Sequence, residues 1–286
     1  SDLTLPVFFM GDWNLIGLPV MVENSDYSIL FPDAIDNTLY SFNGSYASED
    51  MLVTGNGFWL RFENSGSVNI TGGNILNQAV NLYEGWNLVS GISQSVYLNN
   101  ISDPDELIIP GTLYDYGEIG YMESWILEPG KGYWLRTYEA GVITVTSGAL
   151  SKTVNQDFSF NGKANTFSIN GSELYFGVEL SDRERLSYSL PPKPPAGAFD
   201  VRFKDGWRAV KDYGEVEIMP TTEALTIAFD IMLNAGEHYN WVLTATNGEE
   251  YILEGSGEIT IPSAERFTLG RKEVIPATFT LHQNFP

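Results

Sequence analysis

An internal duplication in the first half of the chain constrains its fold more than any other feature. The tripeptide Trp-Asn-Leu at residues 13–15 recurs at residues 86–88. The run Gly-Phe-Trp-Leu-Arg at residues 57–61 recurs as Gly-Tyr-Trp-Leu-Arg at residues 132–136. These matches stand 73 and 75 residues apart, in the same order along the chain. A period of this kind is typical of two copies of one supersecondary unit.

Both copies show the alternation of β-strands. In the first copy Phe58, Leu60 and Phe62 alternate with Trp59 and Arg61, which is the period of two expected for a strand. We expect a small antiparallel sheet of about five strands in each copy. The first copy would span residues 1–76 and the second residues 77–150. The two copies should pack together, since one small sheet cannot bury its apolar face alone.

The second half also reads as β structure, but without the repeat. Phe199, Val201 and Phe203 alternate with polar residues, and Asn247-Gly248 separates two strand-like runs. Asn-Gly in that position is a strong hairpin signal, because both residues tolerate the positive φ of a type I′ turn. We therefore predict an all-β protein, with tandem duplicated antiparallel units followed by a β-sandwich at residues 151–272.

The run Pro-Pro-Lys-Pro-Pro at residues 191–195 cannot join a central strand, because proline lacks the backbone N–H donor. It should form a stiff polyproline segment. One interpretation is a ligand for a groove like that of an SH3 domain. The interpretation we favour is a rigid connector across an edge of the sandwich.

Composition excludes several classes of function. The chain carries a net charge of −22, and 15 of these negative charges fall on residues 1–150. A nucleic-acid partner or an anionic membrane surface is therefore not expected. No cysteine is present, which excludes disulfides and thiolate metal sites. No apolar run approaches the roughly 18 residues of a membrane-spanning helix, so membrane insertion is not expected.

Candidate catalytic groups are few. The two histidines, His238 and His282, lie in an expected turn and in the C-terminal tail, and no nucleophile elbow, zinc-protease motif or phosphate-binding loop occurs. We therefore expect no enzyme and no cofactor. Asp103, Asp105 and Glu106 lie close together in sequence and could offer oxygen ligands to calcium. The alternative, an acidic turn facing solvent, is the one that we favour.

The recurring tryptophans should serve the core that the copies share. Aromatic residues found in one copy only are better ligand candidates, and Trp125 and Tyr138 stand where the first copy has Asp50 and Glu63. An exposed aromatic face can stack on a sugar ring, so these two residues are the candidate carbohydrate site. Ordinary packing is the alternative. We also expect local cation–π contacts of Arg61 with Trp59 and of Arg136 with Trp134, because the two members of each pair share one face of a strand.

The C-terminal tail carries the most specific motif. It matches a pattern of an aromatic residue, a leucine and then Gln-Asn-aromatic-Pro, through Phe279, Leu281, Gln283, Asn284, Phe285 and Pro286. This resembles the opening of the sorting domain carried by cargo of the type IX secretion system. The resemblance extends to the Gly-Trp-Asn-Leu strand at residues 85–88 and to a β-sandwich module found upstream of such domains. It implies that residues 273–286 are a linker, with the body of the sorting domain beyond them.

The resemblance implies an extracellular or cell-surface protein of a Gram-negative bacterium, with the secretion machinery as a partner through that sorting domain. We expect a non-catalytic region that serves as a spacer, adhesive or assembly unit. One alternative is a carbohydrate-binding region attached to a secreted enzyme, with a polysaccharide as partner. Another is the subunit of an extracellular filament, with the chain itself as partner.

Overall fold

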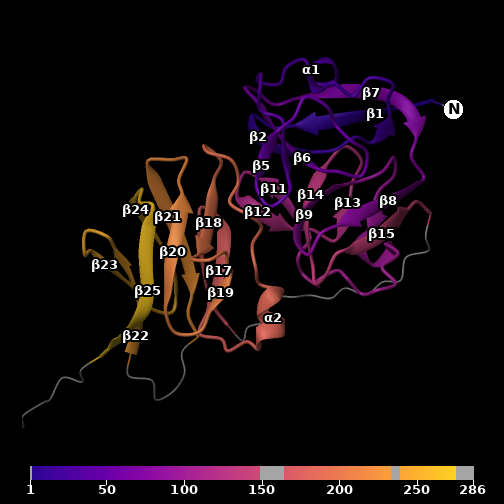
Figure 1. The fold of residues 1–286 in the computed structure, drawn as a ribbon. Coiled ribbons are helices and arrows are strands. Elements are labelled where there is room, and N and C mark those ends of the chain that lie inside the picture. The colour runs from indigo at the N-terminus through magenta and orange to yellow at the C-terminus, as the bar shows by residue number, and fades with distance from the viewer. Residues whose placement is uncertain (1, 149–163, 233–238, 275–286) are drawn as a thin grey trace, which may run out of the picture.

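The computed structural model describes residues 2–148, 164–232 and 239–274 (Figure 1). These residues form an all-β protein with two lobes. The duplicated half is coloured indigo to magenta in Figure 1, and the second lobe is coloured orange to yellow.

The first copy has seven strands and one short helix. In chain order these are β1 (Asp2–Phe9), β2 (Asp12–Ile16), β3 (Val20–Met21), α1 (Tyr27–Leu30), β4 (Tyr40–Phe42), β5 (Tyr46–Ser48), β6 (Phe58–Phe62) and β7 (Gly66–Asn74). They form a four-stranded sheet in the order β2-β6-β4-β5 and a three-stranded sheet in the order β1-β7-β3.

The second copy repeats this plan. Its elements are β8 (Asn77–Leu82), β9 (Gly85–Ser90), β10 (Val96–Tyr97), the 3-10 helix η1 (Leu98–Asn100), β11 (Tyr114–Gly117), β12 (Gly120–Glu123), β13 (Ile126–Leu127), β14 (Gly132–Thr137) and β15 (Gly141–Thr146). The sheet order β9-β14-β11-β12 matches β2-β6-β4-β5 strand for strand, and the pair β8-β15 matches β1-β7. The duplication seen in the sequence is therefore a duplication of structure.

The sequence led us to expect one sheet in each copy, but the first copy holds two sheets and the second holds three, the third being the short pair β10-β13. The first and last long strands of a copy pair with each other, β1 with β7 and β8 with β15, and stay out of the four-stranded sheet. This pairing joins residues 57 to 71 positions apart, which an alternating pattern cannot specify. Each copy then encloses its own apolar core between its sheets.

The asparagine of the Trp-Asn-Leu motif explains why that motif recurs. The Asn14 amide donates to the Met10 and Asp12 carbonyls and accepts from the Met10 N–H, all at 2.9 Å. Asn87 makes the equivalent three bonds to Tyr83 and Gly85. The asparagine thus closes the turn before β2 and β9 and leaves the flanking Trp and Leu side chains for the core.

The second lobe is a sandwich of two five-stranded sheets. Its elements are β16 (Asn165–Ile169), β17 (Ser172–Phe176), α2 (Asp182–Leu186), β18 (Asp200–Phe203), β19 (Ala209–Val210), β20 (Gly214–Met219), β21 (Ala224–Asp230), β22 (Tyr239–Ala245), β23 (Glu250–Leu253), β24 (Ser256–Pro262) and β25 (Arg266–Glu273). The strand orders are β19-β17-β16-β21-β24 and β18-β20-β25-β22-β23. Buried residues of both sheets, such as Phe167 and Leu243, share one core.

The predicted hairpin at Asn247-Gly248 is confirmed, but the turn type is different. Strands β22 and β23 pair across it, and only Gly248 has a positive φ, of 86°. The Gly248 N–H donates to the Ala245 carbonyl at 2.9 Å, and the Ala245 N–H donates to the Glu249 carbonyl at 2.8 Å. A single left-handed glycine after an ordinary turn therefore closes the hairpin, in place of the type I′ turn.

Candidate functional site

Ten aromatic side chains from the two copies form one group, which we call the aromatic cluster. Five positions of the repeat contribute, and each supplies one residue from the first copy and one from the second. The pairs are Trp13 and Trp86, Tyr40 and Tyr114, Phe42 and Tyr116, Tyr46 and Tyr121, and Trp59 and Trp134. The expectation that the recurring tryptophans serve a shared core is confirmed, with Trp59 and Trp134 fully buried.

The aromatic contacts obey a local two-fold symmetry. Trp59 of the first copy packs edge-on against Tyr116 of the second, with ring centroids 4.8 Å apart. The equivalent contact runs the other way, from Trp134 to Phe42, also at 4.8 Å. Each tryptophan is therefore buried by the other copy, so neither copy completes this part of its core alone.

Backbone contacts repeat the same symmetry. The Gly17 N–H donates to the Gly130 carbonyl at 3.1 Å, and the equivalent Ser90 N–H donates to the Gly55 carbonyl at 3.0 Å. A Cβ on Gly57 would lie 2.5 Å from the Val89 carbonyl oxygen, and one on the equivalent Gly132 would lie 2.6 Å from the Ile16 oxygen. Glycine recurs before the Trp-Leu-Arg motif because the other copy's backbone occupies that space.

The arginines of the repeat stack on a different tryptophan from the one that we expected. The Arg61 guanidinium lies over Trp13, and that of Arg136 over Trp86, each 5.7 Å from the ring centroid. Trp13 stands opposite Arg61 in the pairing of β2 with β6. Trp59 shares that face of the strand, but Trp13 is the direct cross-strand neighbour of Arg61, and Trp59 packs against Tyr116.

The second lobe docks on the aromatic cluster through residues 190–199, which we call the proline segment. The hydroxyls of Tyr46 and Tyr121 donate to the carbonyls of Lys193 and Pro192, each at 2.7 Å. The Trp13 indole N–H donates to the Ala196 carbonyl at 3.1 Å. The Tyr116 hydroxyl donates to the Phe199 carbonyl at 2.9 Å. Side chains from both copies therefore bind the main chain of this segment.

The sandwich holds the proline segment from the other side. Arg202 is buried and forms two hydrogen bonds with Asp200, of 2.5 and 2.8 Å. Its third donor bonds to the Pro191 carbonyl at 2.7 Å. The opposite charge of Asp200 raises the pKa of Arg202 against the opposing effect of burial. Asp200 fixes the arginine, and the arginine fixes the start of the segment.

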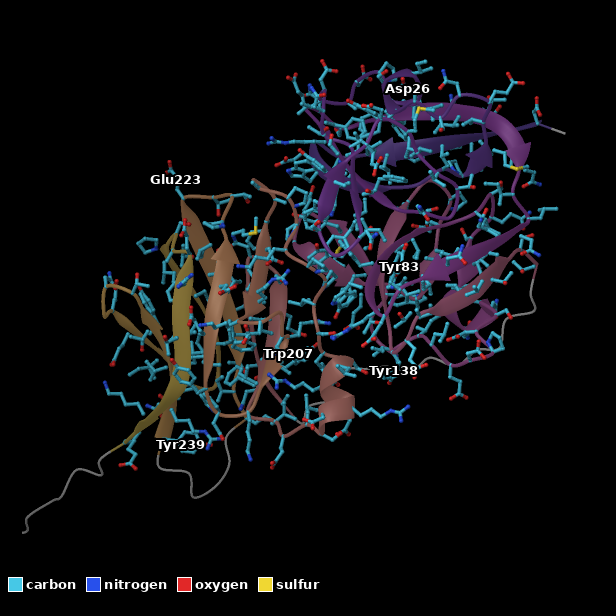
Figure 2. All side chains as sticks on the ribbon, in the orientation of Figure 1. Asp26, Tyr83, Tyr138, Trp207, Glu223 and Tyr239 are labelled. Carbon is cyan, nitrogen blue, oxygen red and sulfur yellow. The ribbon has the colours of Figure 1, made fainter. Side chains whose placement is uncertain are left out.

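A second arginine crosses the junction of the two lobes. Arg208 pairs with Glu123 of β12, lies 5.2 Å from the Tyr175 ring centroid and 3.5 Å from the Tyr114 hydroxyl. Its side chain is only 13% exposed. Arg183 of α2 also stacks on Tyr138 of the duplicated half, at 5.3 Å. Figure 2 places Tyr138 beside α2, where the two lobes meet.

Burial at this junction has a consequence at high pH. It raises the pKa of Tyr46, Tyr116 and Tyr121 above the ordinary value of 10.0. The folded protein therefore keeps protons that the unfolded chain releases. The stabilisation that the three protonated hydroxyls give the folded protein is complete below pH 10. It is lost as the pH rises toward their pKa values in the folded protein. We expect these hydroxyls to ionise only together with cooperative unfolding, as seen by tyrosinate absorbance and near-ultraviolet circular dichroism. Full ionisation in a protein that keeps its tertiary signal would contradict this.

The two residues of the candidate carbohydrate site have different surroundings. Trp125, beside β13, is 68% exposed. Tyr138 is partly buried, and its ring is covered by Arg183. Of these two residues, Trp125 alone presents an exposed aromatic face of the kind that a sugar needs.

The candidate calcium loop uses its first carboxylate internally. The two oxygens of Asp103 accept from the N–H groups of Leu107 and Ile108, both at 2.9 Å, while Asp105 and Glu106 are exposed. Across residues 2–148, 164–232 and 239–274, no three acidic or histidine side chains gather closely enough to hold a metal ion. The geometry thus gives the calcium prediction no support.

Other predicted residues lie outside the described residues. These are both histidines, His238 and His282, and the tail residues Phe279, Leu281, Gln283, Asn284, Phe285 and Pro286. In the described part of the chain, no helix has the length and apolar character to span a membrane.

Sequence reasoning missed the residues that join the lobes. Tyr46 and Tyr121 recur between the copies, but recurrence does not show that their hydroxyls face outward to another domain. Tyr116 carried a weak signal, because it replaces Phe42 at the equivalent position and adds a hydroxyl that bonds to Phe199.

Comparison with family models, curated proteins and solved structures found none that is similar to this chain.

Proposed function

We propose that this chain is a non-catalytic β-module region of an exported bacterial surface protein, in which it serves as a rigid spacer or assembly unit. The observation that supports this best is the binding of the proline segment between the lobes. Five of its carbonyls accept hydrogen bonds from side chains, of which four belong to the duplicated half and the fifth is Arg202 of the sandwich. Such a junction suits a module that keeps two lobes at a fixed orientation.

The contacts made by the buried arginines and tyrosines at the junction of the lobes agree with this proposal. Arg208, Tyr46, Tyr116 and Tyr121 are engaged in polar contacts between the lobes. Arg202 holds the proline segment within the sandwich and lies 6.0 Å from the Tyr121 ring centroid of the other lobe. Their pKa shifts have structural causes, namely burial and paired charge. The location outside the cell rests on the resemblance of the tail to a sorting domain.

A carbohydrate-binding role is the second candidate, because Trp125 leaves its face open to solvent. The two candidates separate in one experiment with the purified chain. We expect no turnover on a panel of glycan and peptide substrates and no retention on a polysaccharide array. Carbohydrate binding would be favoured if the protein is retained on the array and Trp125→Ala weakens that retention. The control Tyr213→Ala, at a position of similar exposure, should then leave retention unchanged. Turnover abolished by a single substitution would overturn the non-catalytic proposal.

A further inference from the structure

The two tyrosines that bind the proline segment are equivalent residues of the two copies. Tyr46 and Tyr121 stand 75 positions apart and bond to the adjacent carbonyls of Lys193 and Pro192. The segment therefore crosses the local two-fold axis, and the duplication supplies a pair of donors that one copy could not. Trp13 and Tyr116 extend this row of donors to Ala196 and Phe199.

The chemistry of the contacts suits proline in particular. Every donor in this row belongs to the duplicated half, and every acceptor is a main-chain carbonyl of the segment. Four of the five residues at 191–195 are prolines, which have no N–H that would need a partner at this aromatic surface. Proline also restricts the free segment, so less conformational entropy is lost when it is bound.

We propose that the surface formed by Trp13, Tyr46, Tyr116 and Tyr121 is a recognition site for an extended proline-rich segment, and that the segment of a second copy of this chain can replace the chain's own. A second copy reproduces every contact, because the residues are the same. Exchange of an identical element between protomers is a low-cost route to linked chains. Within one chain, the high effective concentration of the tethered segment favours the closed form. This inference does not depend on the location or the non-catalytic role proposed above.

The test uses the full chain with a protease site inserted in the stretch that joins Gly148 to Ala164. After cleavage of the folded protein, we expect the two parts to elute together. A labelled peptide with the sequence of residues 190–200 should bind and displace the sandwich, and a scrambled peptide should not. Sandwich parts from a second, differently tagged sample should exchange into the complex.

The variant Tyr46→Phe/Tyr121→Phe keeps both rings and removes the two hydroxyl donors. We expect it to weaken the association of the parts, and peptide binding, by about tenfold to a hundredfold. The matched control Tyr83→Phe/Tyr213→Phe changes two exposed tyrosines and should leave both unchanged. Three results would overturn the proposal: parts that separate on cleavage, a peptide that fails to bind the wild-type protein, or a double variant that binds as the wild type does.

Discussion

Replacing Trp59 by alanine is expected to lower the free energy of unfolding by about 3–5 kcal/mol, which is the range for a large aromatic residue lost from a core. Trp59 is fully buried and packs on Tyr116 of the other copy at 4.8 Å. Because Trp134 makes the equivalent contact with Phe42, Trp134→Ala should cost a similar amount. Urea unfolding followed by circular dichroism measures both.

Trp125→Ala is the matched control for this prediction. Its side chain is 68% exposed, so its loss should change stability by no more than about 0.5 kcal/mol. A small effect for Trp59→Ala, or effects that differ widely between Trp59 and Trp134, would show that the copies do not complete each other's core.

The second large effect is expected at Asp200. Asp200→Ala would leave the buried Arg202 guanidinium without its counter-charge, and removal of one partner of such a pair costs about 3–5 kcal/mol. The variant should also loosen the proline segment, since Arg202 bonds to the Pro191 carbonyl. Thermal and urea unfolding measure the first effect.

An exposed ion pair provides the comparison. Glu250→Ala breaks the pair with Lys272, whose side chains are 41% and 59% exposed, and should cost no more than about 1 kcal/mol. If Asp200→Ala were as mild as Glu250→Ala, the buried pair would not be holding the junction.

The sequence predicted the repeated parts of this fold well. The alternation at residues 58–62 is strand β6, and the recurrence of Trp59 as Trp134 correctly indicated a shared core. Both signals are local or periodic, so they can be read without knowing which segments meet. The pairing of β1 with β7 could not be predicted, because no pattern within either strand indicates which other strand it pairs with.

The junction of the lobes was beyond sequence reasoning for the same reason. Tyr46 bonds to a residue 147 positions away, and its hydroxyl could equally have faced water. The proline segment was predicted as a stiff connector, and its stiffness was the only property that composition could reveal. One local signal was overlooked: Ser181 and Glu184 form a capping box that begins α2.

The proline segment is expected to hold the two lobes in one orientation. The chain has no cysteine, so the exposed positions Ser67 of β7 and Glu258 of β24 can be changed to cysteine and spin-labelled without other reactive thiols. Double electron–electron resonance then measures the distance between the lobes. We expect one narrow distance distribution, which broadens in Tyr46→Phe/Tyr121→Phe. A broad or bimodal distribution in the otherwise native chain would contradict the account.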